Sequence, residues 1–134
     1  MAKADVEMLR RAYATFDEDG LGAVQHLLDE EFEMRVPPDG PFAALGPFHG
    51  TEGWERLLAE RDEAFAEVRL FPERFIDLGE RVLVLGSQTA RSREGGVELE
   101  TTMSHLWTLR DGKAIACEIY VSHKAALAAV GFEE

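Results

Sequence analysis

The chain has 134 residues, of which 46% are hydrophobic and 30% are charged. It contains 14 basic and 26 acidic residues. The net charge of −12 repels phosphate groups, so nucleic acids and anionic membranes are poor partners. The length fits a single domain over residues 1–134 that can bury its own core.

The cysteine content argues against a disulfide bond and against a structural zinc site. The single cysteine, Cys117, cannot form an intramolecular disulfide, and no cysteine–histidine cluster has the spacing of a zinc site. Residues 1–13 lack the apolar core of a signal peptide, and no apolar run approaches membrane-spanning length. We therefore expect a protein of the reducing cytoplasm with no metal.

The first third of the chain predicts two helices and a strand. Apolar residues recur at spacings of three and four over residues 4–18, which is typical of an amphipathic helix. A second, short helix is predicted over residues 21–31. Phe32, Met34 and Val36 then alternate with charged residues, which indicates a short strand.

A loop rich in turn formers, residues 37–50, precedes a third predicted helix over residues 52–67. Thr51 is the expected N-cap of this helix. Its buried stripe is predicted to comprise Trp54, Leu57, Leu58 and Phe65.

The rest of the chain predicts a four-stranded meander and a closing helix over residues 123–132. Asp111-Gly112 is the strongest of its hairpin signals. The predicted strands are residues 68–79, 81–92, 97–109 and 113–122.

This order of elements predicts an α+β domain, with helices on one side of a curved antiparallel sheet. Residues 82–85 and 105–109 are apolar at positions that point to both faces. Exposed apolar patches of that size are rare on monomers, so we expect a symmetric homodimer packed sheet to sheet.

Four stretches resemble the nuclear-transport-factor-two-like superfamily, in particular its SnoaL-like (polyketide-cyclase-like) and ketosteroid-isomerase-like members. They are residues 10–37, 48–65, 75–86 and 105–134. The resemblance implies a cone-shaped, cystatin-like fold that encloses a deep apolar pocket, usually in a homodimer. Members include isomerases, epoxide hydrolases, cyclases and dehydratases, so the fold alone does not decide the function.

The acids of the ketosteroid isomerases are not matched here. Their base aspartate corresponds to Val36 or Pro37, and their oxyanion-hole aspartate corresponds to Ser104. Their helix-one tyrosine falls at Ala12, one residue from Tyr13. The resemblance therefore disfavours steroid isomerisation.

Other family acids are also replaced. Many SnoaL-like proteins place an aspartate two residues after the tyrosine of the last strand, where this chain has Ser122. No pair of aspartates bridged by an arginine, as in the epoxide hydrolases, is evident. Any enzymatic chemistry must come from other groups.

Glu118, His105 and Tyr120 are the candidate catalytic residues. A shielded Glu118 could act as a general base, or it could form a salt bridge to Arg35 or Arg91. His105 could shuttle protons with Glu118, or it could be a hydrogen-bonded core residue. Tyr120 could donate to a substrate carbonyl, or its hydroxyl could be satisfied within the core.

The candidate ligand-binding residues are Tyr13, Trp54, Phe65 and Ser104. The first three are expected to wall an apolar cavity between the helices and the sheet. Strand alternation puts His105 on one face and Ser104 on the other, but one bulge would exchange the faces, so the pocket face stays open.

Two functions fit these features. One is an isomerase, cyclase or lyase that acts without a cofactor on a small hydrophobic or polyketide-like molecule. The other is a dimeric, non-catalytic ligand-binding or accessory module. The missing family acids favour the second, and the polar residues of the last two strands favour the first.

Overall fold

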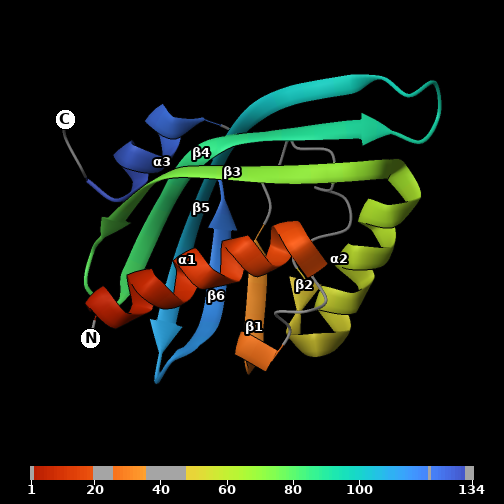
Figure 1. Cartoon of the computed structure of the whole chain (residues 1–134). Coiled ribbons are helices and arrows are strands. Elements are labelled where there is room, and N and C mark those ends of the chain that lie inside the picture. Colours follow the sequence, from red (N-terminus) through yellow and green to blue (C-terminus); the bar gives the residue numbers. More distant parts are fainter. Residues whose placement is uncertain (1, 20–25, 36–47, 121, 132–134) are drawn as a thin grey trace.

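A computed structural model describes residues 2–19, 26–35, 48–120 and 122–131. It is an α+β structure in which a strongly curved, unclosed sheet of six strands is combined with three helices (Figure 1). The predicted fold class is confirmed.

The strands lie in the order β2-β1-β6-β5-β4-β3 across the sheet. Strands β3 to β6 form the predicted antiparallel meander, whereas β1 pairs with β6 in parallel. The strands are β1 (Leu28–Arg35), β2 (Phe48–His49), β3 (Phe65–Asp77), β4 (Arg81–Ser92), β5 (Glu98–Arg110) and β6 (Lys113–Ile119).

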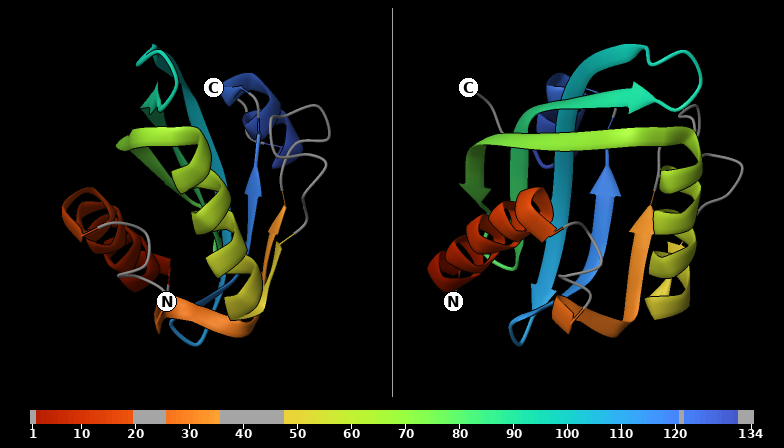
Figure 2. Two further views of the ribbon diagram at one scale, coloured as in Figure 1. Left: turned by 90° about the vertical axis from the view of Figure 1, so that its right-hand side faces the viewer. Right: turned by 45° about the vertical axis from the view of Figure 1, so that its right-hand side comes forward.

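The helices lie on opposite faces of the sheet (Figure 2). Helices α1 (Ala2–Asp19) and α2 (Gly50–Ala64) cover what we call the inner face. Helix α3 (His123–Ala129) packs on the outer face. The two faces therefore have separate hydrophobic clusters.

The larger of these, the inner cluster, joins α1 and α2 to inward-facing residues of β1, β2, β4, β5 and β6. Its buried members are Leu9, Ala12, Tyr13, Phe32, Met34, Phe48, Trp54, Leu57, Val82, Val84, Met103, Trp107, Leu109, Ala114 and Cys117. The smaller, outer cluster comprises Ile76, Leu83, Leu85, Leu106 and Ala126.

The predicted helix over residues 21–31 is wrong over its last four residues, whereas residues 26 and 27 do have a helical (3₁₀) conformation. Residues 28–31 belong to β1, and residues 20–25 lie outside the described part of the chain. The parallel ladder to β6 satisfies the backbone of β1, which local helical spacing cannot reveal. The alternation of Phe32 and Met34 is confirmed, and Val36 and Pro37 lie outside the described residues.

The third predicted helix is confirmed but displaced. It begins at Gly50, where φ is +62°, and ends at Ala64. His49 occupies the N-cap position, so the prediction of Thr51 as the cap is wrong. Phe65 pairs with Ser92 and begins β3, because the long ladder to β4 overrides helix propensity there.

The outer apolar residues of the meander are covered within the chain. Leu83, Leu85 and Leu106 are buried, and Ala126 of α3 belongs to their cluster. The apolar pattern that motivated a sheet-to-sheet homodimer is thus explained in large part by α3.

Candidate functional site

Three polar side chains form a hydrogen-bonded chain on the inner face. Trp107 donates from Nε1 to the hydroxyl oxygen of Tyr13 over 2.8 Å. That hydroxyl lies 2.8 Å from Nδ1 of His105. Helix α1 supplies the tyrosine and β5 supplies the other two residues, whose side chains share a face because they are two positions apart.

Aromatic rings surround this chain. The rings of Tyr13 and His105 are nearly parallel, with centroids 6.0 Å apart, whereas Phe75 and Trp107 meet Tyr13 edge-on at 6.0 and 6.4 Å. Phe32 extends the group, with its ring centroid 6.3 Å from that of Trp107. Such pairs bury a large apolar area in a defined geometry.

Burial controls the protonation of these groups. It lowers the pKa of His105 to about 4 and raises the pKa of Tyr13 well above its ordinary value. It also raises the pKa of the Cys117 thiol, with a smaller contribution from the charge of Glu118. The imidazole, the phenol and the thiol are therefore all uncharged at neutral pH.

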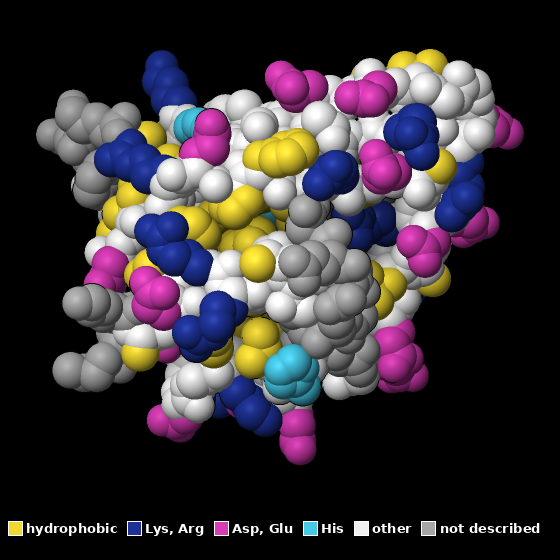
Figure 3. All heavy atoms as spheres, viewed as in Figure 1, with side chains coloured by type: hydrophobic (Ala, Val, Ile, Leu, Met, Phe, Trp, Pro, Cys, Tyr) yellow, Lys and Arg dark blue, Asp and Glu magenta, His cyan; other side chains and the backbone are white. Residues whose placement is uncertain are grey.

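His105 is nevertheless only half-buried, although it lies deep in the fold. Its Nε2 makes no hydrogen bond to any residue in the described part of the chain. Figure 3 shows hydrophobic side chains gathered between α1 and β3, with basic residues beside them. Half-buried Phe75 belongs to this region, and the Arg10 guanidinium lies 4.4 Å from its ring centroid.

Trp54 reaches the same inner cluster from α2. It is 2% exposed, and its ring meets that of Phe32 edge-on at a centroid distance of 5.9 Å. Its Nε1 has no hydrogen-bond partner among the residues that the structure describes, which is uncommon for a buried indole. Phe65, by contrast, is a half-buried residue at the start of β3 and is not part of the cluster among the residues described.

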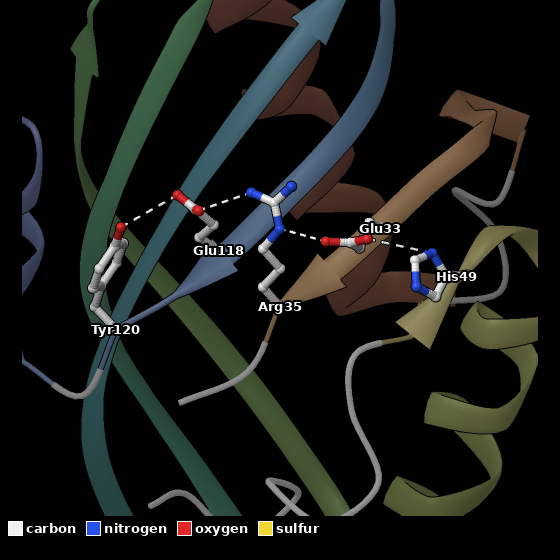
Figure 4. A network of polar contacts seen from close by, with 5 residues as sticks. All are labelled: Glu33, Arg35, His49, Glu118 and Tyr120. Carbon is white, nitrogen blue, oxygen red and sulfur yellow. Dashed lines mark hydrogen bonds and ion pairs between the residues drawn. The ribbon is translucent and has the colours of Figure 1, made fainter. Parts of the chain in front are cut away.

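A second polar group lies on the outer face (Figure 4). Arg35 binds Glu33 through Nε and Glu118 through Nη1, the latter over 2.9 Å. Tyr120 donates to Oε2 of Glu118 over 3.2 Å, and Nδ1 of His49 lies 3.4 Å from Oε2 of Glu33. We call these five residues the outer network.

The outer network shows which cation forms the ion pair with Glu118. It is Arg35, because the parallel register sets these two residues side by side, and not Arg91. Their side chains are 54% and 32% exposed for Arg35 and Glu118. Hydrogen bonds to Glu33, then to Glu118, raise the pKa of Arg35. Burial, followed by the charge of Glu118, raises the pKa of Tyr120.

The predicted pairing of His105 with Glu118 is wrong. In the register of β5 and β6, His105 faces Ile119 and Leu106 faces Glu118. Directly paired residues point to the same side of a sheet, and successive residues point to opposite sides. His105 therefore lies on the inner face, and Glu118 and Tyr120 lie together on the outer face.

Ser104 is also on the outer face, so it does not line one site with Tyr13 and Trp54. It is 1% exposed, its hydroxyl has no hydrogen-bond partner in the described part of the chain, and its carbonyl accepts from the Tyr120 backbone over 3.0 Å. The resemblance to the ketosteroid isomerases had placed Ser104 at the position of their oxyanion-hole aspartate. In the structure it is the next residue, His105, that bonds to Tyr13.

Two other residues gain defined positions. Ser122 caps α3, since its side chain accepts from the backbone of Ala125 over 3.0 Å. Trp107, as the partner of Tyr13, was missed as a site residue. Strand alternation places it beside His105, but contact with Tyr13 on α1 depends on helix packing that the sequence does not specify.

Within residues 2–19, 26–35, 48–120 and 122–131, no group of three or more His, Cys, Asp or Glu could hold a metal ion. None of the helices described is both long and apolar enough to cross a membrane.

Comparisons with known proteins agree with this fold. The family model described as SnoaL-like domain matches residues 9–116. An NTF2-like protein of unknown function from Burkholderia pseudomallei is 25% identical, with a TM-score of 0.78 over 94% of this chain and 96% of that one. TerC, crystallised with polyporic acid, is 26% identical, with a TM-score of 0.78 over 95% and 98%.

A protein with a ketosteroid isomerase-like fold from Catenulispora acidiphila, in complex with trimethylamine, shares that fold at 16% identity. Its TM-score is 0.72 over 95% of this chain and 94% of that one. No curated protein matches the chain significantly.

Proposed function

The chain belongs to the SnoaL-like domain family, and on that basis we propose that it binds a small hydrophobic molecule against the inner face of its sheet. The observation that carries the proposal is His105, a half-buried residue among aromatic rings whose Nε2 is not bonded to any described residue. A mostly apolar surface with a few fixed polar groups is typical of small-molecule sites.

The ligand class is a cyclic or polyketide-like molecule of low polarity. Apolar contacts with half-buried aromatic residues such as Phe75 would supply most of its binding energy. The crystallisation of TerC, a structural relative, with polyporic acid supports an aromatic ligand. Polyporic acid is therefore a suitable first probe.

In the catalytic form of the proposal, the protein is an isomerase, cyclase or lyase that needs no cofactor. His105 is the polar group that would touch the substrate from the inner face, and the buried Tyr13 would hold it there. The predicted catalytic roles of Glu118 and Tyr120 would require a second approach from the outer face, beside the buried Ser104. The hydroxyl of Ser104, which bonds to none of the described residues, favours that second location.

The non-catalytic alternative also has support. Among the side chains that the structure describes, Ser104 is the buried polar one, so no described carboxylate is buried against the inner cluster. The cluster therefore lacks the usual general base of an isomerase. A binding or accessory module needs no such base, so it fits the inner face equally well.

Tryptophan fluorescence tests ligand binding directly. The chain has two tryptophans, Trp54 and Trp107, and both belong to the inner cluster. Titration with polyporic acid should give a saturable change after correction for absorbance with free N-acetyltryptophanamide. A change that follows absorbance alone would contradict the proposal for this probe. Chromatography of the incubated probe would then distinguish catalysis from binding.

We also propose a cytoplasmic homodimer that associates through the outer face. The half-exposed side chains of Arg35 and Glu118 support this choice, since α3 does not cover them. Sedimentation velocity at micromolar concentration should give a mass of about twice 14.9 kDa. A clean species at the single-chain mass would contradict the dimer.

A further inference from the structure

The hydrogen bonds of the inner face have a direction. An indole nitrogen can only donate, so Trp107 must give its proton to the oxygen of Tyr13. A phenol that accepts in this way still carries its own proton. The geometry lets it give that proton to Nδ1 of His105, 2.8 Å away.

We infer that Trp107, acting through Tyr13, is a positioning residue that holds His105 in the tautomer with its proton on Nε2. His105 then offers a ligand a hydrogen-bond donor and not a base. The ligand class follows: an apolar molecule that presents a carbonyl or enolate oxygen. The assignment of the His105 tautomer is argued from the hydrogen bonds alone, whereas the ligand class rests on the proposed function.

The proton balance fixes what His105 can do. Its Nδ1 lone pair accepts from Tyr13, and its Nε2 already carries the ring proton. A proton abstracted from a ligand carbon would have no free nitrogen lone pair to receive it. The Nε2–H can instead donate to an oxygen that gains negative charge, as donors in an oxyanion hole do. Burial favours this role because it keeps the ring neutral.

The opposite arrangement is chemically distinct. If Nδ1 of His105 carried the proton, the Tyr13 oxygen would accept from both His105 and Trp107, and Nε2 would be a lone-pair acceptor. His105 would then suit a ligand hydroxyl or act as a base. The two arrangements differ in which ring nitrogen carries the proton, which NMR measures directly.

The first experiment is long-range proton–nitrogen NMR on the labelled full chain at pH 7. The signals of His105 are assigned by their loss in His105→Gln, since the chain has four histidines. We expect the pattern of a neutral ring protonated at Nε2. A ring protonated at Nδ1 in the wild-type protein would overturn the inference, whatever the variants do.

Variants test the positioning role. In folded Trp107→Phe, the tyrosine loses its donor, and we expect the His105 signals to move toward a mixture of tautomers. Tyr13→Phe should give such a mixture even if Trp107→Phe does not fold. An unchanged Nε2–H pattern in folded Trp107→Phe would show that Trp107 does not position His105. A purely structural residue would leave the tautomer unaffected.

The second experiment compares two probes of nearly equal shape, 2-acetylnaphthalene and 2-ethylnaphthalene. We expect the ketone to bind about tenfold more tightly, as one added hydrogen bond allows. In His105→Phe the ratio should fall to about one, because the donor is gone. Equal binding of both probes to the wild-type protein would overturn the ligand class and leave the apolar site intact. Binding of neither would contradict the proposed function, and the tautomer would still be decided by NMR.

Discussion

Burial keeps the polar residues of the inner face neutral, and this property separates them from the residues of the outer network. Tyr13, His105 and Cys117 all have a pKa displaced in the direction that disfavours charge. Arg35 and Glu118, by contrast, form an ion pair that remains partly exposed. Each face therefore has its own chemistry: uncharged hydrogen bonding inside and charge pairing outside.

The low pKa of His105 predicts a pH-dependent stability. The folded state holds the ring at a pKa of about 4, whereas the unfolded chain has the ordinary value near 6.5. Between these values the unfolded state binds more protons, so the free energy of unfolding falls as the pH drops from 6.5 toward 4, by up to about 3 kcal/mol. Urea unfolding at several pH values measures this change in the free energy of unfolding. His105→Gln should flatten this part of the profile, and parallel profiles would contradict the assignment.

Removal of the Tyr13 hydroxyl should destabilise the fold. Tyr13→Phe leaves Nε1 of Trp107 and Nδ1 of His105 without their partner in the core, which costs about 1–3 kcal/mol. Tyr120→Phe is the matched control, because its hydroxyl bonds to the partly exposed Glu118 and should cost under about 1 kcal/mol. Equal losses in denaturant unfolding would refute this ranking.

For single residues, the sequence predicted the face of the sheet from local strand geometry, but it did not identify distant contact partners. Strand alternation correctly separates His105 from Ser104, because side chains of a strand point alternately to its two faces. The partner of His105 is Tyr13, 92 positions away, and only the packing of α1 onto the sheet brings them together. The sequence narrowed the partners of Glu118 to two arginines, and the parallel register of β1 and β6 selects Arg35.

Among the secondary-structure elements, those with strong local signals were predicted best. The strand over residues 81–92 has the predicted bounds, and the Asp111-Gly112 turn joins β5 to β6. The two errors, in β1 and at the end of α2, lie where helical spacing competes with a ladder to a distant strand. In both places the hydrogen bonds of the sheet decide the structure, and local periodicity does not contain them.

Helix α3 depends on its cap. Ser122→Ala removes the side-chain acceptor at the N-terminus of α3 and should cost about 1 kcal/mol. Thr51→Ala is the control, because that residue lies inside the first turn of α2 and does not cap it. Its effect should stay within about 0.5 kcal/mol. If thermal unfolding showed a larger loss for Thr51→Ala, the assignment of caps would be reversed.

At the scale of the whole molecule, the curved sheet separates two groups of polar side chains that the sequence could not assign to faces. Residues of β5 and β6 alternate between an apolar inner face with a neutral histidine and an outer face with an ion-pair network. The fold class and meander follow from composition and periodicity, whereas the placement of His105 and Glu118 on opposite faces required the register. The central claim is that a ligand binds on the inner face, at His105.

A comparison of two variants in one titration tests that claim most directly. The dissociation constant of polyporic acid is measured by tryptophan fluorescence for wild type, His105→Phe and Glu118→Gln, each first shown to be folded by its thermal melt. We predict binding about tenfold weaker for His105→Phe, because a hydrogen bond is lost, and binding within about twofold of wild type for Glu118→Gln. Weakened binding in Glu118→Gln together with unchanged binding in His105→Phe would contradict the account and place the site on the outer face.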